Sequence, residues 1–163
     1  GGFPLSAVTG RAEVVDAAPV GGIGGTYAGN PLAVAAAHAV IEVIEEEQLC
    51  ERSEKIGSEI KARLKDIAAR PGMEMIADVR GLGSMVAFEL VQVGTNDANP
   101  ALTQAIVAEA EANGLIILPC GTRGNVVRLL PPLTTPMDQL AEALDILDQA
   151  IATAVEVSSS QAA

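Results

Sequence analysis

A glycine-rich loop over residues 21–29 stands directly before a predicted helix. Five of its nine positions are glycine, and Thr26 contributes a hydroxyl group. Glycines let backbone N–H groups approach a ligand closely, and the start of a following helix carries a partial positive charge. This combination predicts a loop that binds an anion, such as a phosphate, through main-chain contacts. A tight turn that binds no ligand is the alternative interpretation.

Two common phosphate-binding motifs do not match this loop. A dinucleotide-binding fingerprint needs glycine where Tyr27 stands, and it needs a strand before the loop. A P-loop needs Gly-Lys-Ser or Gly-Lys-Thr, and residues 1–50 contain no lysine. The loop therefore belongs to neither class.

Arg128 is the second candidate for chemistry, because it interrupts the apolar segment NVVRLLPP. A guanidinium group on a sheet face that meets a ligand typically binds a carboxylate through two parallel hydrogen bonds. Arg128 is thus a candidate carboxylate-binding residue, with an edge-strand arginine that faces water as the alternative. Arg80, in the segment DVRGLG, is predicted to pair with Asp78 or with a carbonyl group of the turn.

The remaining reactive side chains do not form a catalytic or metal-binding set. His38 is the only histidine, so neither a Ser-His-Asp nor a Cys-His arrangement can be built, and no metal site is predicted. We expect His38 to lie in a core or at an interface. Cys50 and Cys120 are far apart and belong to no CxxC motif, which predicts two free thiols.

Composition limits the class of partner. The formal net charge of −11 argues against nucleic acid and against an anionic membrane surface. The longest apolar stretch, residues 32–44, is interrupted by polar residues and is shorter than the ~20 residues that span a bilayer. No signal-peptide pattern is present. We therefore predict a cytoplasmic protein.

Cap signals and hydrophobic periodicity predict the order loop, α, α, β, β, α, β, β, α. Asn-Pro pairs mark two helix starts, because Asn accepts hydrogen bonds as an N-cap and Pro fits the first helical position. Apolar stripes on the second and last helices predict the buried faces. The predicted helices cover residues 31–46, 51–70 and 100–113 and a segment that opens at 135–136, and the predicted strands cover 73–79, 84–91, 115–118 and 126–130. The expected fold is α/β, with helices packed on a small sheet behind a Gly-rich arm.

Five segments together resemble the class III pyridoxal-phosphate aminotransferases of the ornithine/4-aminobutyrate type, and within them the bacterial 4-aminobutyrate aminotransferases. They are GGFPLSAVTGR, GGIGGTYAGNP, DVRGLGSMVAFEL, GLIILPCG and NVVRLLPPLT. The resemblance implies the C-terminal small domain of a fold-type I pyridoxal-phosphate-dependent transferase. It divides the chain into a remnant of the large cofactor domain (1–30), a linking helix with the small domain (31–155) and a disordered tail (156–163).

The resemblance also implies roles for the two candidate sites. In that family the GGT loop crosses a dimer interface, and its threonine binds the cofactor phosphate held by the neighbouring subunit. This implies that Gly24, Gly25 and Thr26 contact pyridoxal 5'-phosphate in trans within a homodimer. The family arginine of the N-V-x-R strand binds the substrate carboxylate and corresponds to Arg128.

No residue of this chain receives a catalytic role. The family's Schiff-base lysine precedes the segment that matches Gly1, and the three lysines here lie on the polar side of the predicted second helix: Lys55, Lys61 and Lys65. The resemblance implies the C-terminal part of an aminotransferase that moves the amino group of 4-aminobutyrate to 2-oxoglutarate, inactive alone. The alternatives are another ω-amino-acid or ornithine-type aminotransferase, including one for 5-aminovalerate, acetylornithine or diaminobutyrate, and a non-catalytic interaction module derived from such an enzyme.

Overall fold

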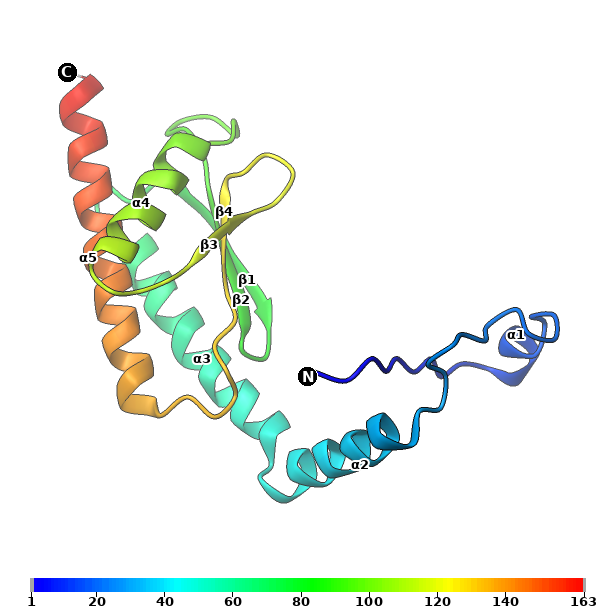
Figure 1. Cartoon of the computed structure of the whole chain (residues 1–163). Helices are drawn as coiled ribbons and strands as arrows, with labels where there is room; N and C mark the ends of the chain where they lie inside the picture. The colour runs from blue at the N-terminus through cyan, green and yellow to red at the C-terminus, as the bar shows by residue number, and fades with distance from the viewer. Residues whose placement is uncertain (1, 163) are drawn as a thin grey trace. The chain divides into compact units, whose positions relative to one another are not determined.

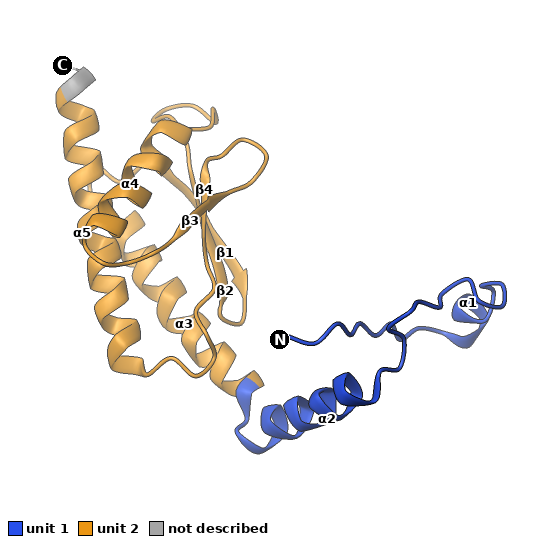
Figure 2. Ribbon diagram, in the orientation of Figure 1, with its two compact units in different colours: residues 1–49 blue, residues 50–163 orange. Residues whose placement is uncertain are grey.

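The computed structural model describes residues 2–162, with side chains through residue 160. The chain forms two compact units, residues 1–49 and residues 50–163 (Figure 2). The predicted domain boundary falls after residue 30, so the units and the predicted domains differ by one helix. The domain assignment itself stays a prediction.

The first unit contains the Gly-rich arm and two helices, α1 (Ala12–Val15) and α2 (Pro31–Glu46). The Asn30 side chain accepts hydrogen bonds from the N–H groups of Leu32 (3.0 Å) and Ala33 (3.3 Å), so α2 begins at the predicted cap. The short α1 was not predicted, because no side chain caps its start. Ala33 is the one fully buried residue of α2. His38 is exposed, so a core position for it is wrong, while an interface position stays a prediction.

The second unit is an α/β layer structure, as predicted (Figure 1). Its elements are α3 (Leu49–Ala68), β1 (Ile76–Leu82), β2 (Met85–Leu90), α4 (Pro100–Ala112), β3 (Leu118–Cys120), β4 (Val126–Leu129) and α5 (Met137–Ala162). The four strands form one antiparallel sheet in the order β1-β2-β4-β3.

The helices α3, α4 and α5 pack on one face of this sheet (Figure 1). Phe88, Val86 and Val127 point from the strands into the core. The helix residues that meet them include the predicted stripes: Ile56, Ile60, Leu64 and Ile67 on α3, and Leu140, Leu144, Leu147 and Ile151 on α5. Alternate strand residues point to the opposite face of the sheet, which is exposed at Arg80 and Arg128.

Two strand predictions need correction. The segment 80–83 was predicted as a turn, yet β1 continues through Leu82 and the tight turn is confined to Gly83 and Ser84. Gly83 alone adopts a left-handed backbone there (φ 52°), which glycine allows at little cost. The third strand was predicted at 115–118 but lies at 118–120, because the Leu115 N–H closes the end of α4 on the Ala110 carbonyl (2.9 Å).

The tail prediction is also corrected. The sequence predicts disorder over 156–163, whereas α5 continues to Ala162, and residue 163 lies outside the described residues. The hydroxyl groups of Ser159 and Ser160 donate hydrogen bonds to the carbonyls of Val155 and Glu156, each at 2.9 Å. These local bonds satisfy the serine side chains without breaking the helix.

Candidate functional site

The Gly-rich loop presents free hydrogen-bond donors beside a hollow. Residues 4–6 and 23–29 line a hollow of about 490 Å³. Among residues 2–162, no carbonyl accepts a hydrogen bond from the backbone N–H groups of Gly25, Thr26 or Tyr27. A Cβ atom added at Gly25 would meet no heavy atom within 4 Å, so the space above this residue is open. Free N–H groups beside a threonine hydroxyl form a donor set suited to an oxyanion.

The start of α2 contributes less than the sequence suggested. Asn30 already accepts hydrogen bonds from Leu32 and Ala33, and the Val34 N–H bonds to the Asn30 carbonyl at 2.9 Å. These N–H groups are satisfied within the helix, so they are not available to an anion. The candidate donors therefore lie in the loop, at residues 25–27.

Arg128 lies on the exposed face of the sheet in the second unit. The register aligns Arg80, Ala87, Arg128 and Leu118 across the four strands. Because β4 is an inner strand of the sheet, the alternative of an edge-strand arginine is wrong, although the side chain is exposed. Within the described part of the chain, Arg128 forms neither an ion pair nor a side-chain hydrogen bond.

Exposed apolar side chains lie beside Arg128 on this face, which also carries Glu89 at a diagonal position. Three large ones are exposed at neighbouring positions in the register or along the strand: Met85, Leu118 and Leu130. A guanidinium among apolar groups interacts more strongly with a carboxylate once a ligand excludes water. This arrangement provides one cation for binding a carboxylate at an apolar surface.

Arg80 is an ion-paired residue. Its Nη1 donates to Asp78 Oδ2 at 2.6 Å, as predicted, and to Glu89 Oε2 at 3.0 Å. These hydrogen bonds, the one to Asp78 first, raise the pKa of Arg80 above its usual value. Arg80 is therefore occupied, in contrast to Arg128 in the same row.

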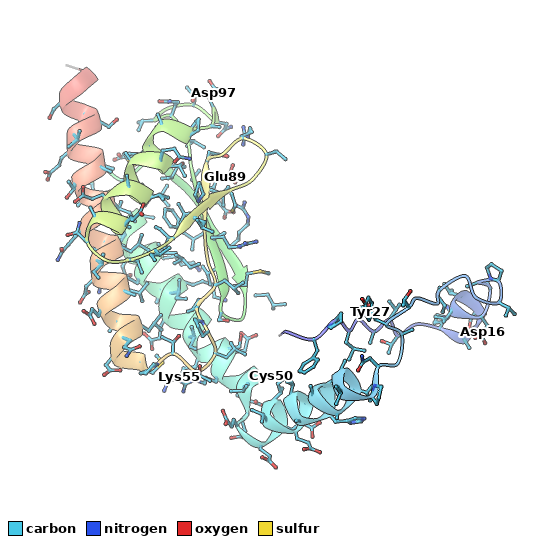
Figure 3. The ribbon with its side chains drawn as sticks, in the orientation of Figure 1. Asp16, Tyr27, Cys50, Lys55, Glu89 and Asp97 are labelled. Atoms are coloured by element: carbon cyan, nitrogen blue, oxygen red, sulfur yellow. The ribbon has the colours of Figure 1, made fainter. Side chains whose placement is uncertain are left out.

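Glu89 is a residue that sequence reasoning missed. Its Oε1 accepts hydrogen bonds from Arg123 Nη2 (3.0 Å) and Asn125 Nδ2 (3.2 Å). The hydrogen bond from Asn125, followed by those from Arg80 and Arg123, lowers the pKa of Glu89 below its usual range. Alternation along β2 places Glu89 on the outer face, and residues 34 and 36 positions away in the sequence complete the cluster. Figure 3 shows Glu89 on the sheet.

The lysines and cysteines add no catalytic set. Lys55, Lys61 and Lys65 all lie on α3, where Lys55 (Figure 3) and Lys65 are exposed. Cys50 and Cys120 are free, as predicted. Across residues 2–162 there is no group of three potential metal ligands, and no helix is long and apolar enough to cross a membrane.

Comparison with known proteins defines the family. A family model described as "Aminotransferase class-III" matches residues 1–151. The chain therefore belongs to the class III aminotransferases, as the five sequence segments predicted. The family and its structural neighbours imply pyridoxal phosphate as the cofactor.

Individual relatives agree with this family. The chain is 50% identical to the 5-aminovalerate aminotransferase of Pseudomonas putida, covering 93% of this chain and 35% of that protein. It is 49% identical to the 4-aminobutyrate aminotransferase of Mycobacterium leprae, and the match covers 91% of this chain and 33% of that protein. The solved structure of Toxoplasma gondii ornithine aminotransferase superimposes with a TM-score of 0.76 at 29% identity. The superposition covers 90% of this chain and 33% of that structure's chain. The chain thus spans about a third of the length of the curated relatives it matches.

Proposed function

We propose that this chain supplies the carboxylate-recognition residue and the phosphate-binding loop of a pyridoxal-phosphate-dependent aminotransferase. Its amino donor is 4-aminobutyrate, and its acceptor is 2-oxoglutarate. The observation that carries the proposal is Arg128, an exposed guanidinium with no partner in the described chain, set among apolar side chains on an inner strand. The family membership supplies the reaction class.

Arg128 binds the carboxylate of the amino donor through its planar guanidinium. The two parallel N–H groups match the two carboxylate oxygens, which fixes the orientation of the substrate as well as its position. The acceptor 2-oxoglutarate also carries carboxylates, so one arginine serves both halves of the reaction. The apolar neighbours of Arg128 reduce competition from water when the ligand is bound.

Gly24, Gly25 and Thr26 hold the cofactor phosphate in this proposal. The free N–H groups at residues 25–27 and the open space above Gly25 fit a phosphate group. We infer that the loop acts in trans, within a homodimer. Pyridoxal phosphate, when bound, supplies the electron sink for moving an amino group. No lysine of this chain has a role in that step, since all three lie on α3.

Other amino donors of the same class are the main alternatives. Two relatives about 50% identical to this chain are named for 5-aminovalerate and 4-aminobutyrate, respectively. These donors differ by one methylene group and share the carboxylate that Arg128 would bind. Ornithine, acetylornithine and diaminobutyrate are further candidates. A non-catalytic interaction module would need neither the phosphate loop nor a free Arg128. The cytoplasmic location stays a prediction.

A substrate panel on the complete gene product tests the proposal. The purified protein, supplied with pyridoxal phosphate and 2-oxoglutarate, is assayed for glutamate formation with 4-aminobutyrate, 5-aminovalerate and ornithine. The proposal predicts the highest kcat/KM for 4-aminobutyrate. A higher kcat/KM for 5-aminovalerate or ornithine would replace the proposed donor, and no glutamate with any donor would contradict the proposed reaction.

A further inference from the structure

Glu89 and Arg128 are diagonal neighbours on the exposed face of the sheet. In the β2–β4 register, Ala87 lies opposite Arg128 and Glu89 lies opposite Val126. Diagonal positions on one face of an antiparallel pair are within reach of long side chains. An unrestrained Glu89 carboxylate would therefore be able to pair with Arg128 and neutralise it.

Both oxygens of Glu89 are instead occupied by other groups. Oε2 accepts a hydrogen bond from Arg80 at 3.0 Å, and Oε1 accepts from Arg123 at 3.0 Å and from Asn125 at 3.2 Å. Asn125 is only 2% exposed, and its Nδ2 also donates to the Leu90 carbonyl at 2.9 Å. The β2 backbone thus fixes the side-chain amide of Asn125, and this amide in turn holds the carboxylate of Glu89.

The charges around Glu89 balance without Arg128. The ion pairs join two carboxylates, Asp78 and Glu89, with two guanidinium groups, Arg80 and Arg123. This cluster is electrically neutral, so it leaves no carboxylate in excess to attract the neighbouring arginine. Among residues 2–162, Arg128 keeps its positive charge uncompensated.

We infer that Arg80, Arg123 and Asn125 are positioning residues that hold the Glu89 carboxylate away from Arg128 and so keep Arg128 free for a carboxylate ligand. This inference rests on the proposed role of Arg128. Loss of the two arginines leaves Oε2 of Glu89 without a partner, while Asn125 keeps its hydrogen bond to Oε1. The freed oxygen then pairs with Arg128 and competes with the ligand within the same molecule. A purely structural role for the cluster would predict no such competition.

Arginine-specific modification of the 163-residue chain tests this inference. Phenylglyoxal reacts with unpaired guanidinium groups faster than with ion-paired ones, and peptide mass spectrometry reports the rate at Arg128. In the double variant Arg80→Gln/Arg123→Gln, the Arg128 rate is expected to fall about two- to fivefold, the effect of one exposed cross-strand ion pair. Adding Glu89→Gln to the double variant should restore the wild-type rate. The rate at Arg11, in the other unit, is the internal standard.

A matched control separates release of Glu89 from loss of charge. Arg70→Gln removes a guanidinium of similar exposure, 45% against 55% for Arg123, but one that pairs with Asp148 on α5. This variant should leave the Arg128 rate unchanged. An unchanged Arg128 rate in the double variant would overturn the inference. A slower rate that Glu89→Gln does not restore would overturn it as well.

The phenylglyoxal modification also distinguishes failure of this inference from failure of the proposed function. In the complete gene product with pyridoxal phosphate, protection of wild-type Arg128 by 4-aminobutyrate, with n-butylamine as the carboxylate-free control, reports ligand binding. Protection without the Glu89-dependent slowing would leave the proposed role of Arg128 intact and overturn only the inference. Glu89-dependent slowing without protection would contradict carboxylate binding by Arg128, on which the inference depends.

Discussion

Gly57 on α3 packs directly against the backbone of Gly83 in the β1–β2 turn. A Cβ atom added at Gly57 would overlap the carbonyl oxygen of Gly83, so only glycine fits. Ser53, one turn earlier on α3, accepts a hydrogen bond from the Ser84 N–H at 2.9 Å and fixes the same turn. Backbone contact and hydrogen bond together set the distance between the helix and the sheet hairpin.

Gly57→Ala is therefore expected to destabilise the second unit. Overpacking in a core costs about 1–3 kcal/mol, which exceeds the roughly 1 kcal/mol that alanine gains over glycine in a helix. Urea unfolding followed by circular dichroism measures the change. Ser58→Ala, at an exposed position of α3, is the control and should change the free energy of unfolding only slightly. Equal stability of Gly57→Ala and wild type would contradict this packing.

Arg52 connects α3 to the segment before α5. Its Nη2 donates to the Thr135 carbonyl at 2.6 Å, and its Nε donates to the Leu133 carbonyl. Arg52→Ala leaves these carbonyls unpaired, and hydrogen bonds to a charged group contribute about 1.5–3 kcal/mol. We expect a loss of that size in the free energy of unfolding. Lys55→Ala, exposed on the same helix, is the control, and an equally small effect at both positions would contradict a role for Arg52.

Asp148 on α5 makes the stability depend on pH. The hydrogen bond from Arg70 is the main cause that lowers the pKa of Asp148 below its usual range. The charges of Arg70 and Arg63 lower this pKa further, and partial burial opposes them. Because the folded pKa is depressed, the stabilisation is present above the unfolded pKa of about 3.9 and is lost as pH falls through the folded value. Asp148→Asn should therefore be less stable than wild type at pH 7, with a gap that narrows below about pH 4. A gap independent of pH would contradict this assignment.

Thr26 provides a test of the proposed phosphate loop. In the complete gene product, Thr26→Ala should weaken retention of pyridoxal phosphate roughly 10- to 100-fold, as expected for one hydrogen bond to a charged group. Thr26→Ser keeps the hydroxyl and should retain the cofactor. Equilibrium dialysis with absorbance of the cofactor measures retention. Thr95→Ala, in an exposed loop of the other unit, is the control. Equal retention by Thr26→Ala and wild type would remove the hydroxyl from the proposed site.

The features that were predictable from sequence are local ones. Asn30-Pro31 and Asn99-Pro100 encode their own caps, and α2 and α4 begin at the expected residues with the predicted asparagine contacts. The apolar stripe of α5 likewise needs no knowledge of its partners. The order of elements in the second unit follows from such signals.

The features that sequence did not reveal depend on distant residues. The end of β1 follows from its pairing with β2, and Gly81 is extended there rather than turned (φ 158°). The Glu89 cluster joins strands β1 and β2 to the loop at 121–125, which no local pattern indicates. The Gly57 contact with the hairpin is equally invisible in the sequence. For this reason the candidate Arg128 could be predicted, whereas the Glu89 cluster beside it could not.

The central claim is that Arg128 recognises the carboxylate of the amino donor, and one kinetic comparison tests it most directly. The complete gene product and its Arg128→Gln variant are compared in kcat/KM for 4-aminobutyrate and for n-butylamine, which lacks the carboxylate. The account predicts that the variant loses roughly 10- to 100-fold in kcat/KM for 4-aminobutyrate and little for n-butylamine. An equal loss for both amines, or no loss for 4-aminobutyrate, would contradict it.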